Sequence, residues 1–200
     1  MATSEVIKLG GVRLSFPKLF TPKAFVDKDG NKSSERFEAA FLLDPSDKTH
    51  AAIIADIVEK ATDLANEQWH NKIPKSVELC FGYSDAQAIA VGDLKWHGKE
   101  KEYDGYEGMF YISSANRTRP TVVDRDRSPL VEADGKPYPG CIVNASITLW
   151  TQDNQWGKRI NANLRAVQFV KDGEAFGAKP VAAEDEFDVV DGDEDDGFLD

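Results

Sequence analysis

Hydrophobic and polar residues alternate with a period of two in several short stretches of this chain, a pattern typical of β-strands with one buried face. In the stretch from Arg36 to Leu43, for example, the residues on one face are Phe37, Ala39, Phe41 and Leu43, and they alternate with Arg36, Glu38 and Ala40. Other stretches are short apolar runs of strand length. The predicted strands cover Val6–Leu14, Phe37–Leu43, Val77–Tyr83, Met109–Ile112, Cys141–Leu149 and Leu164–Val170.

One stretch has the periodicity of a helix. Ile53, Ile57, Ala61 and Leu64 recur at helical spacing, with further apolar residues beside them on the same face. Ser46 or Asp47 provides the N-cap after Pro45, and Pro74 lies shortly beyond the end. The spacing therefore predicts a single long helix that begins near residue 47 and ends at about Trp69.

Glycine and proline mark the breaks between these elements. Gly10 and Gly11 predict a bulge or sharp bend in the first strand. Ser15–Phe25 contains two prolines and is predicted to be an ordered apolar loop. Turns are expected at Asp27–Gly30 and at Asp134–Gly135. Several short strands with one helix predict a mainly β protein of α+β class, built as a small barrel.

Charge is distributed unevenly along the 200 residues, which carry a net charge of −11. Ten acidic residues and no Lys or Arg lie in Glu184–Asp200, which leaves 25 acidic and 24 basic residues elsewhere and a formal charge of −1. A block of like charge repels itself and buries little surface. We therefore expect a folded domain at residues 1–178 and a disordered acidic tail at residues 179–200.

The sequence contains few signs of catalysis, export or membrane insertion. It lacks a phosphate-binding loop, a nucleophile elbow and an HExxH motif, and its three histidines stand apart from one another. No metal site, cofactor or enzymatic activity is expected. Cys80 and Cys141 lie in apolar runs, where buried free thiols are usual. Without a signal peptide or a spanning stretch, a soluble cytoplasmic protein is expected.

Basic and aromatic residues are interleaved in three connections, the pattern that single-stranded nucleic acid requires for its phosphates and bases. The first holds Lys95 and Trp96, and the last is a polar loop between Trp150 and Trp156. Trp150 is the best single candidate, because its neighbours on the same strand face are polar. The predicted DNA-binding residues are Lys95, Trp96, Tyr106, Tyr111, Arg117, Arg119, Arg125, Arg127, Trp150, Lys158 and Arg159. A purely structural role for the tyrosines, and self-compensated surface charge at Arg125 and Arg127, remain open.

The acidic tail also contains apolar residues that a solvated linker does not need. Phe198 is a candidate anchor for a basic, apolar pocket of a partner protein, with the carboxylates steering the approach. The tail could equally lie in the protein's own positive groove and compete with DNA, or serve solubility alone. The predicted partner-binding residues are Asp191, Asp193, Glu194, Asp195, Asp196 and Phe198.

Four stretches spread from Val12 to Gly177 resemble a family of phage-encoded single-stranded-DNA-binding proteins. They read VRLSFPKLFTPKAF, FEAAFLLDPSDK, YPGCIVNASI and LRAVQFVKDGEAFG. The resemblance implies a five-stranded OB-fold barrel with an inserted helix, and sequence-independent binding of single-stranded DNA in replication, recombination or repair. It also implies regulation by the tail. Here Leu199 and Asp200 follow Phe198, a departure that favours self-regulation over mimicry of a host protein's terminus.

The sequence thus predicts a non-enzymatic protein that binds single-stranded DNA in the cytoplasm of a phage-infected host and recruits replication or recombination proteins through its tail. A homodimer is one option for its assembly. Two alternatives stay open. One is an acidic DNA mimic that sequesters a basic host protein, and the other is a metal-dependent nuclease built from dispersed carboxylates.

Overall fold

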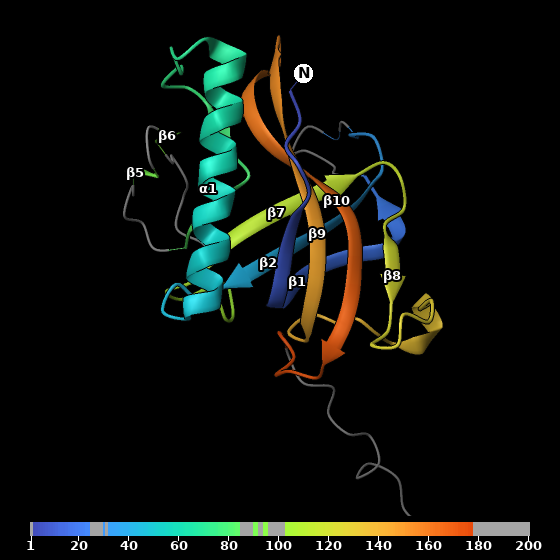
Figure 1. Ribbon diagram of the computed structural model, residues 1–200. Helices are drawn as coiled ribbons and strands as arrows, with labels where there is room; N and C mark the ends of the chain where they lie inside the picture. The colour runs from blue at the N-terminus through green and yellow to red at the C-terminus, as the bar shows by residue number, and fades with distance from the viewer. Residues whose placement is uncertain are drawn as a thin grey trace, which may run out of the picture.

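Five strands of this protein form a closed ring of hydrogen-bonded neighbours (Figure 1). The ring consists of β1 (Ile7–Lys23), β2 (Arg36–Leu43), β7 (Phe110–Asn116), β9 (Ile142–Asn154) and β10 (Gly157–Lys171). The computed structural model describes residues 2–24, 30, 32–84, 90–91, 94–95 and 103–177.

The order of the strands around the ring is that of a Greek key. β9 lies beside β1, β1 beside β2 and β2 beside β7, all antiparallel. β10 pairs with β9 along its whole length and meets β7 in parallel, where Asn163 is paired with Ala115. The Asn116 side-chain amide supports this junction by donating to the Leu164 carbonyl at 2.9 Å. The fold is therefore mainly β with one long helix, and its five-stranded ring is OB-like, as predicted.

The first strand is longer than the sequence suggested. β1 continues to Lys23, so the prediction of a loop at Ser15–Phe25 was wrong. Proline has no N–H for a sheet ladder, but Pro17 and Pro22 each fall within a shift of the β1–β2 register, where the ladder skips them. The bulge predicted at the paired glycines is confirmed by a register shift between Leu9 and Val12.

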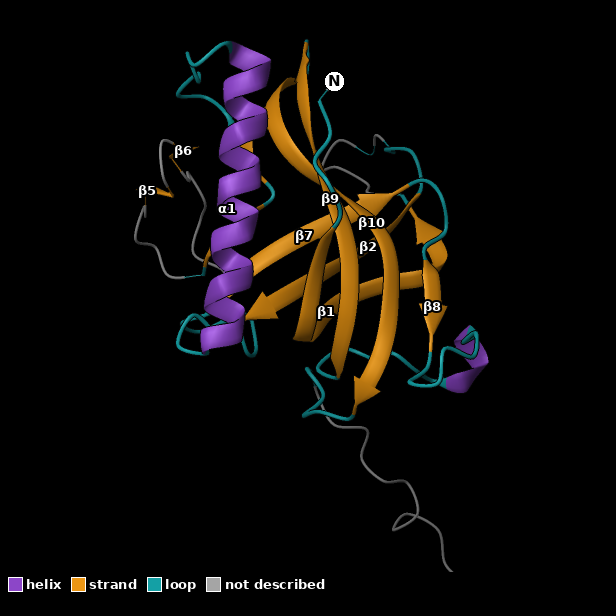
Figure 2. Cartoon of the chain, viewed as in Figure 1, coloured by secondary structure: helices purple, strands orange, loops and turns teal. Residues whose placement is uncertain are grey.

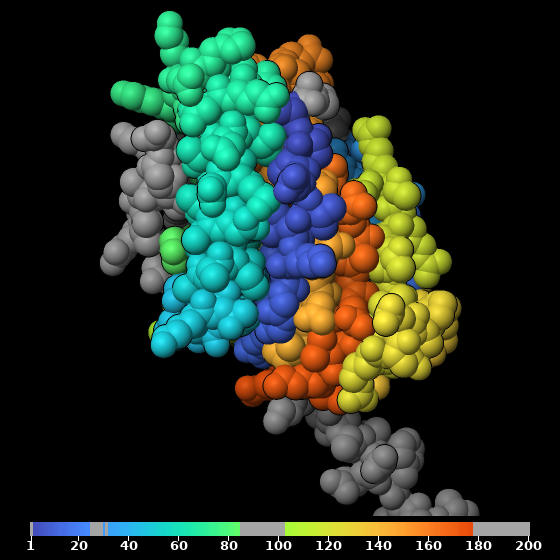
Figure 3. All heavy atoms as spheres, viewed as in Figure 1, coloured from blue at the N-terminus to red at the C-terminus, as the bar shows by residue number. Residues whose placement is uncertain are grey.

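The helix α1 (Lys48–Trp69) has the predicted bounds. Asp47 is its N-cap, and its carboxylate accepts hydrogen bonds from the N–H groups of Thr49 at 2.8 Å and His50 at 3.0 Å. The helix packs beside β1 and β9 (Figure 3). It buries a face consisting of Ile54, Ile57, Ala61, Leu64, Ala65 and Trp69.

Shorter elements complete the described chain (Figure 2). The predicted strand at Val77–Tyr83 is divided at Cys80. The N–H of Cys80 donates a hydrogen bond to the carbonyl of Ile160 in β10, and its carbonyl accepts one from the N–H of Ser113 in β7. Its two halves join different neighbours, because β7 and β10 diverge at this point. The short elements are β3 (Glu78–Leu79), β4 (Phe81–Tyr83), β5 (Ala90–Val91), β6 (Leu94–Lys95), β8 (Thr121–Val123) and a 3-10 turn, η1 (Glu132–Asp134).

The core fills the inside of the ring and the space beneath α1. Phe41, Phe81, Phe110 and Phe169 are all fully buried there. Both cysteines are free thiols, with Cys141 buried and Cys80 half-buried. In the described part of the chain, no helix is both long and apolar enough to cross a membrane.

The N-cap of α1 makes the stability of the fold sensitive to acid. The N–H of His50, followed by that of Thr49, holds the pKa of Asp47 below its ordinary value. The stabilisation is complete above the unfolded pKa of about 3.9 and is lost as the pH falls through the lower folded pKa. Asp47→Asn keeps a good capping residue that does not titrate.

We therefore expect the free energy of unfolding to fall less for Asp47→Asn than for the unaltered protein between about pH 6 and about pH 2, as measured by urea denaturation. Asp63→Asn removes an exposed carboxylate of the same helix that caps nothing, and it should follow the unaltered protein. Equal acid sensitivity in all three proteins would contradict this role of Asp47.

Candidate nucleic-acid interface

An open groove of about 1400 Å³ runs over the ring on the side facing away from the core. Its lining comes from all five ring strands, from the connection between β1 and β2, from the β9–β10 hairpin and from the segment before β7. The charged and aromatic residues that line it are Phe16, Lys18, Lys32, Arg36, Glu38, Tyr103, Tyr106, Tyr111, Arg117, Trp150, Trp156 and Arg159.

Small side chains form the floor of the groove between β2 and β7. Ala40 is paired with Ser113, and Ala115 is paired with Glu38 on the same two strands. Successive residues of a strand point to opposite faces, so these side chains lie together on the outer face. Because they are short, an elongated ligand can lie close to the sheet backbone.

The β9–β10 hairpin carries the most exposed aromatic residue of the described part of the chain. Trp156 is 74% exposed. Its backbone N–H donates a hydrogen bond to Oδ1 of Asn154 at 2.9 Å, and this bond shapes the turn. The last turn of α1 fixes the hairpin from behind, because the Trp69 indole N–H donates to the Asp153 carboxylate at 2.7 Å. Lys158 bonds the same carboxylate. Lys158 and then Trp69 hold the pKa of Asp153 below its ordinary value.

A second group of aromatic rings lines the groove where β1 and the segment before β7 meet. Phe16 and Tyr103 are in edge-to-face contact, with centroids 5.0 Å apart, and both rest against Tyr106. Tyr111 continues the row at 6.0 Å from Tyr106. Burial raises the pKa of Tyr106. Phe16 and Tyr103 remain about half exposed, at 53% and 52%.

The cations of the groove fall into two classes. Lys18 is paired with Glu38 at 2.7 Å, and Arg159 is paired with Glu78 at 2.9 Å. Among the described residues, no carboxylate lies within ion-pair distance of the second class, which consists of Lys32, Arg36 and Arg117. These three side chains have their charge available for an anionic ligand.

The structure brings five of the predicted DNA-binding residues together in this groove. They are Tyr106, Tyr111, Arg117, Trp150 and Arg159. Lys95 lies in β6, and its side chain is outside the described part of the structure, as is the whole of Trp96. The predicted tail residues, from Asp191 to Phe198, also lie outside the described residues.

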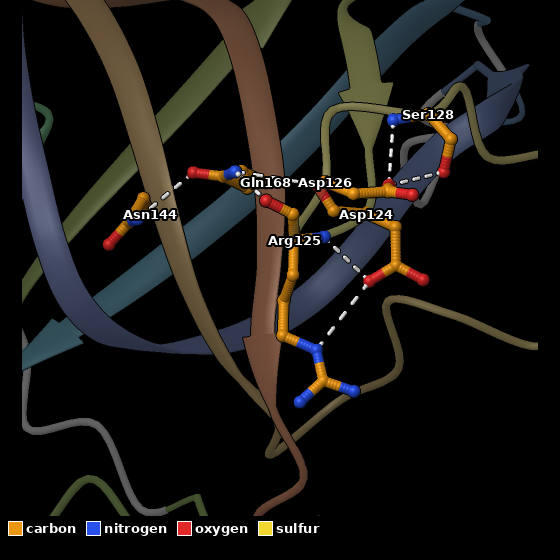
Figure 4. A network of polar contacts seen from close by, with 6 residues as sticks. All are labelled: Asp124, Arg125, Asp126, Ser128, Asn144 and Gln168. Carbon is orange, nitrogen blue, oxygen red and sulfur yellow. Dashed lines mark hydrogen bonds and ion pairs between the residues drawn. The ribbon is translucent and has the colours of Figure 1, made fainter.

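Four other predicted DNA-binding residues do not line the groove. Arg119 lies over the Phe20 ring at 5.6 Å, and Lys158 is held by Asp153. Arg125 and Arg127 lie in the turn after β8, which Asp124 and Asp126 stabilise from within (Figure 4).

This turn is attached to the ring by a row of hydrogen bonds through side-chain amides (Figure 4). Gln168 donates to the carbonyl of Arg125 at 3.2 Å, and Asn144 donates to Gln168 at 3.1 Å. Asn144 in turn accepts from the N–H of Gly11 at 3.0 Å, while the Gly11 carbonyl lies 3.3 Å from Nε2 of His50. The row joins β8 to the first turn of α1, and its polar residues therefore have a structural explanation.

Several residues of the groove were not among the predicted binding residues. Phe16 and Lys18 lie in the stretch that the sequence suggested to be a loop. Lys32 lies in an ordinary polar segment before β2, and Arg36 is the first residue of that strand. A detectable signal existed for Trp156, an aromatic residue in an otherwise polar hairpin, and for Tyr103, which follows a basic segment. The described residues contain no cluster of three or more His, Cys, Asp or Glu that could hold a metal ion.

Comparison with known proteins links this architecture to proteins of bacteriophages. The single-stranded DNA-binding protein of bacteriophage Enc34, solved in complex with ssDNA, superposes with a TM-score of 0.68 at 30% identity, covering 86% of this chain and 89% of that chain. The gp2.5 protein of bacteriophage T7, a single-stranded DNA-binding protein, has a TM-score of 0.51 at 14% identity over 100% of this chain and 97% of that chain. The similarity to gp2.5 shows a shared fold.

Sequence comparison extends the relationship over nearly the whole chain. Putative protein p50 of Acyrthosiphon pisum secondary endosymbiont phage 1 is 38% identical over 184 residues, which are 91% of this chain and 92% of p50. A family model described as "Enterobacter phage Enc34, ssDNA-binding protein" matches residues 5–199. This family is one of DNA-binding proteins rather than enzymes. The chain therefore belongs to the family of the ssDNA-binding protein of Enterobacter phage Enc34.

Proposed function

We propose that this protein binds single-stranded DNA in the groove, without regard to base sequence. The observation that carries the proposal is the lining of the groove, which contains both exposed aromatic rings and cations that have no carboxylate partner among the described residues. Aromatic faces stack on bases of every kind, and cations follow the phosphates, so such a groove accepts any sequence.

The position of the groove in the fold supports the same function. OB folds bind oligonucleotides on the face of their second and third strands and with the loops that join strands one to two and four to five. In this ring the corresponding parts are β2 and β7, the connection before β2, and the β9–β10 hairpin. All of them contribute to the groove, from Lys32 through Ser113 to Trp156.

Family membership supports the identity of the ligand, since the Enc34 relative was solved with ssDNA bound. We infer a role in phage DNA replication, recombination and repair, in the cytoplasm of the host cell, where strands are exposed and require protection. The proposed activity needs no cofactor, because stacking and ion pairing suffice for binding.

We further propose that the acidic tail competes with DNA for the groove and recruits replication or recombination proteins when DNA displaces it. The described chain ends beside the groove. Arg13 donates to the Glu174 carbonyl at 2.8 Å and lies over the Phe176 ring at 4.2 Å, and Phe176 packs against the cluster of Tyr106 and Tyr111. A tethered segment that starts next to its site has a high effective concentration there.

Arg117 and Arg125 offer a matched test of which basic residues contact DNA. Arg117 lines the groove without a carboxylate partner among the described residues, whereas Arg125 lies in the β8 turn beside Asp124. Arg117→Gln should weaken binding of labelled oligo-dT and reduce the slope of log affinity against log salt by about 0.7, the contribution of one neutralised phosphate on a single strand. Arg125→Gln should change neither quantity. Equal losses in the two variants would place the DNA outside the groove.

Removal of the tail tests the proposed competition. A chain that ends at Ala183 should bind oligo-dT more tightly than the full chain, and the difference should shrink as salt screens the tail charges. As a control for length, a full-length chain with amides in place of the ten acidic tail residues should behave like the shortened chain. Lower or unchanged affinity would contradict the competition. Loss of all DNA binding from the shortened chain would favour the acidic DNA mimic.

The reactivity of Cys80 tests, without any substitution, whether bound DNA covers the groove. Cys80 lines the groove, and burial raises the pKa of its thiol to about 12, so its alkylation should be slow. Cys141, which is fully buried, is the internal control. Saturating oligo-dT should slow the alkylation of Cys80 further in intact-mass measurements. An unchanged rate with DNA bound would mean that the strand does not cover the floor of the groove.

A further inference from the structure

Phe16 combines an unfavourable backbone conformation with an exposed aromatic side chain. Its φ is 46°, in the left-handed region that bulky L-residues rarely adopt. It precedes Pro17, which restricts its backbone further. Half of the ring is nevertheless exposed, so burial in the core does not compensate for the strain. Strain of this kind persists where the surrounding structure enforces it, and it is concentrated at functional sites.

The surroundings of Phe16 enforce this conformation. The residue sits in the register shift of β1 between Ser15 and Lys18, which are paired with Ala40 and Glu38 of β2. Ser15 is buried, and its side chain hydrogen-bonds to Tyr106. The backbone is therefore fixed on both sides, and the bulge directs the Phe16 ring into the groove.

Tyr103 completes a two-ring arrangement with Phe16. Their planes meet at 74°, and Tyr106 lies beneath both, 6.4 Å from Phe16 and 5.4 Å from Tyr103. The buried Tyr106 ring thus supports the pair from below, while the two upper rings keep about half of their surface open to the groove. Flat, rigid faces presented in this way match the π-face of a nucleobase.

We infer that Phe16 and Tyr103 form a base-binding subsite in which one nucleobase stacks on the exposed rings. This inference rests on the proposed binding of single-stranded DNA in the groove and names one of its contacts. The ligand of the subsite is the base itself, not the phosphate, because within the described part of the chain no Lys or Arg lies over either ring. The strained bulge at Phe16 serves to hold its ring in place before DNA arrives.

Glycine at position 16 separates this role from a structural one. Glycine adopts positive φ without strain, so Phe16→Gly should leave the midpoint temperature of thermal unfolding unchanged or raise it. Its midpoint should also be higher than that of Phe16→Ala. Both variants should bind oligo-dT about 5- to 150-fold more weakly, the range for loss of one stacked base. Val131→Gly removes an apolar side chain of similar exposure outside the groove, and it should not affect binding.

A strand that lacks bases identifies the contact. On an oligonucleotide of abasic residues, Phe16→Gly should bind as well as the unaltered protein, while Arg117→Gln should still bind more weakly. An undiminished loss on the abasic strand, or unchanged affinity for oligo-dT, would overturn the subsite and leave the proposed function intact. So would altered self-association without altered DNA affinity, measured by sedimentation. If the unaltered protein itself fails to bind oligo-dT, the proposed function fails first.

Discussion

Closure of the ring at the junction of β7 and β10 is the constraint on which the rest of the structure depends. β10 must pair with β9 on one side and reach β7 on the other, and it does so in parallel at Asn163 and Ala115. Before that point the two strands diverge, and Cys80 bridges the gap with one hydrogen bond to each. This divergence widens the outer face, so that side chains of β10, β7 and β2 surround one groove.

The helix holds the ring in shape from both of its ends. Its first turn reaches the glycine bulge of β1 through His50, and its last turn supports the β9–β10 hairpin through Trp69. The hairpin that carries Trp156 is therefore attached to a rigid element rather than to a free loop. Rigid support of this kind reduces the entropy lost when a ligand is bound.

The sequence predicted the elements well because burial patterns are local. The helix and most of the strands were identified from the spacing of apolar residues. The second half of β1 was mistaken for a loop, at Pro17 and Pro22. The end of β9 and the start of β10 were also taken for a polar loop, and β8 was missed. The groove was predicted less completely, because its residues are brought together by ring closure. Arg117 and Arg125 lie in the same basic stretch of sequence, yet only Arg117 lines the groove. Arg125 lies in the turn after β8, which is attached to β10 by long-range contacts such as the hydrogen bond from Gln168, and such contacts cannot be read from composition.

The pairing of β1 with β9 has a consequence for synthesis. Ile7 of β1 is paired with Ile147 of β9, so the ladder between these two strands can form only after the ribosome has made β9. Non-local contacts of this kind slow folding, because a long loop must be closed before the contact contributes. β1 and β2, joined by a short connection, can pair early. The ring itself, and with it the complete groove, forms only after β10 has emerged.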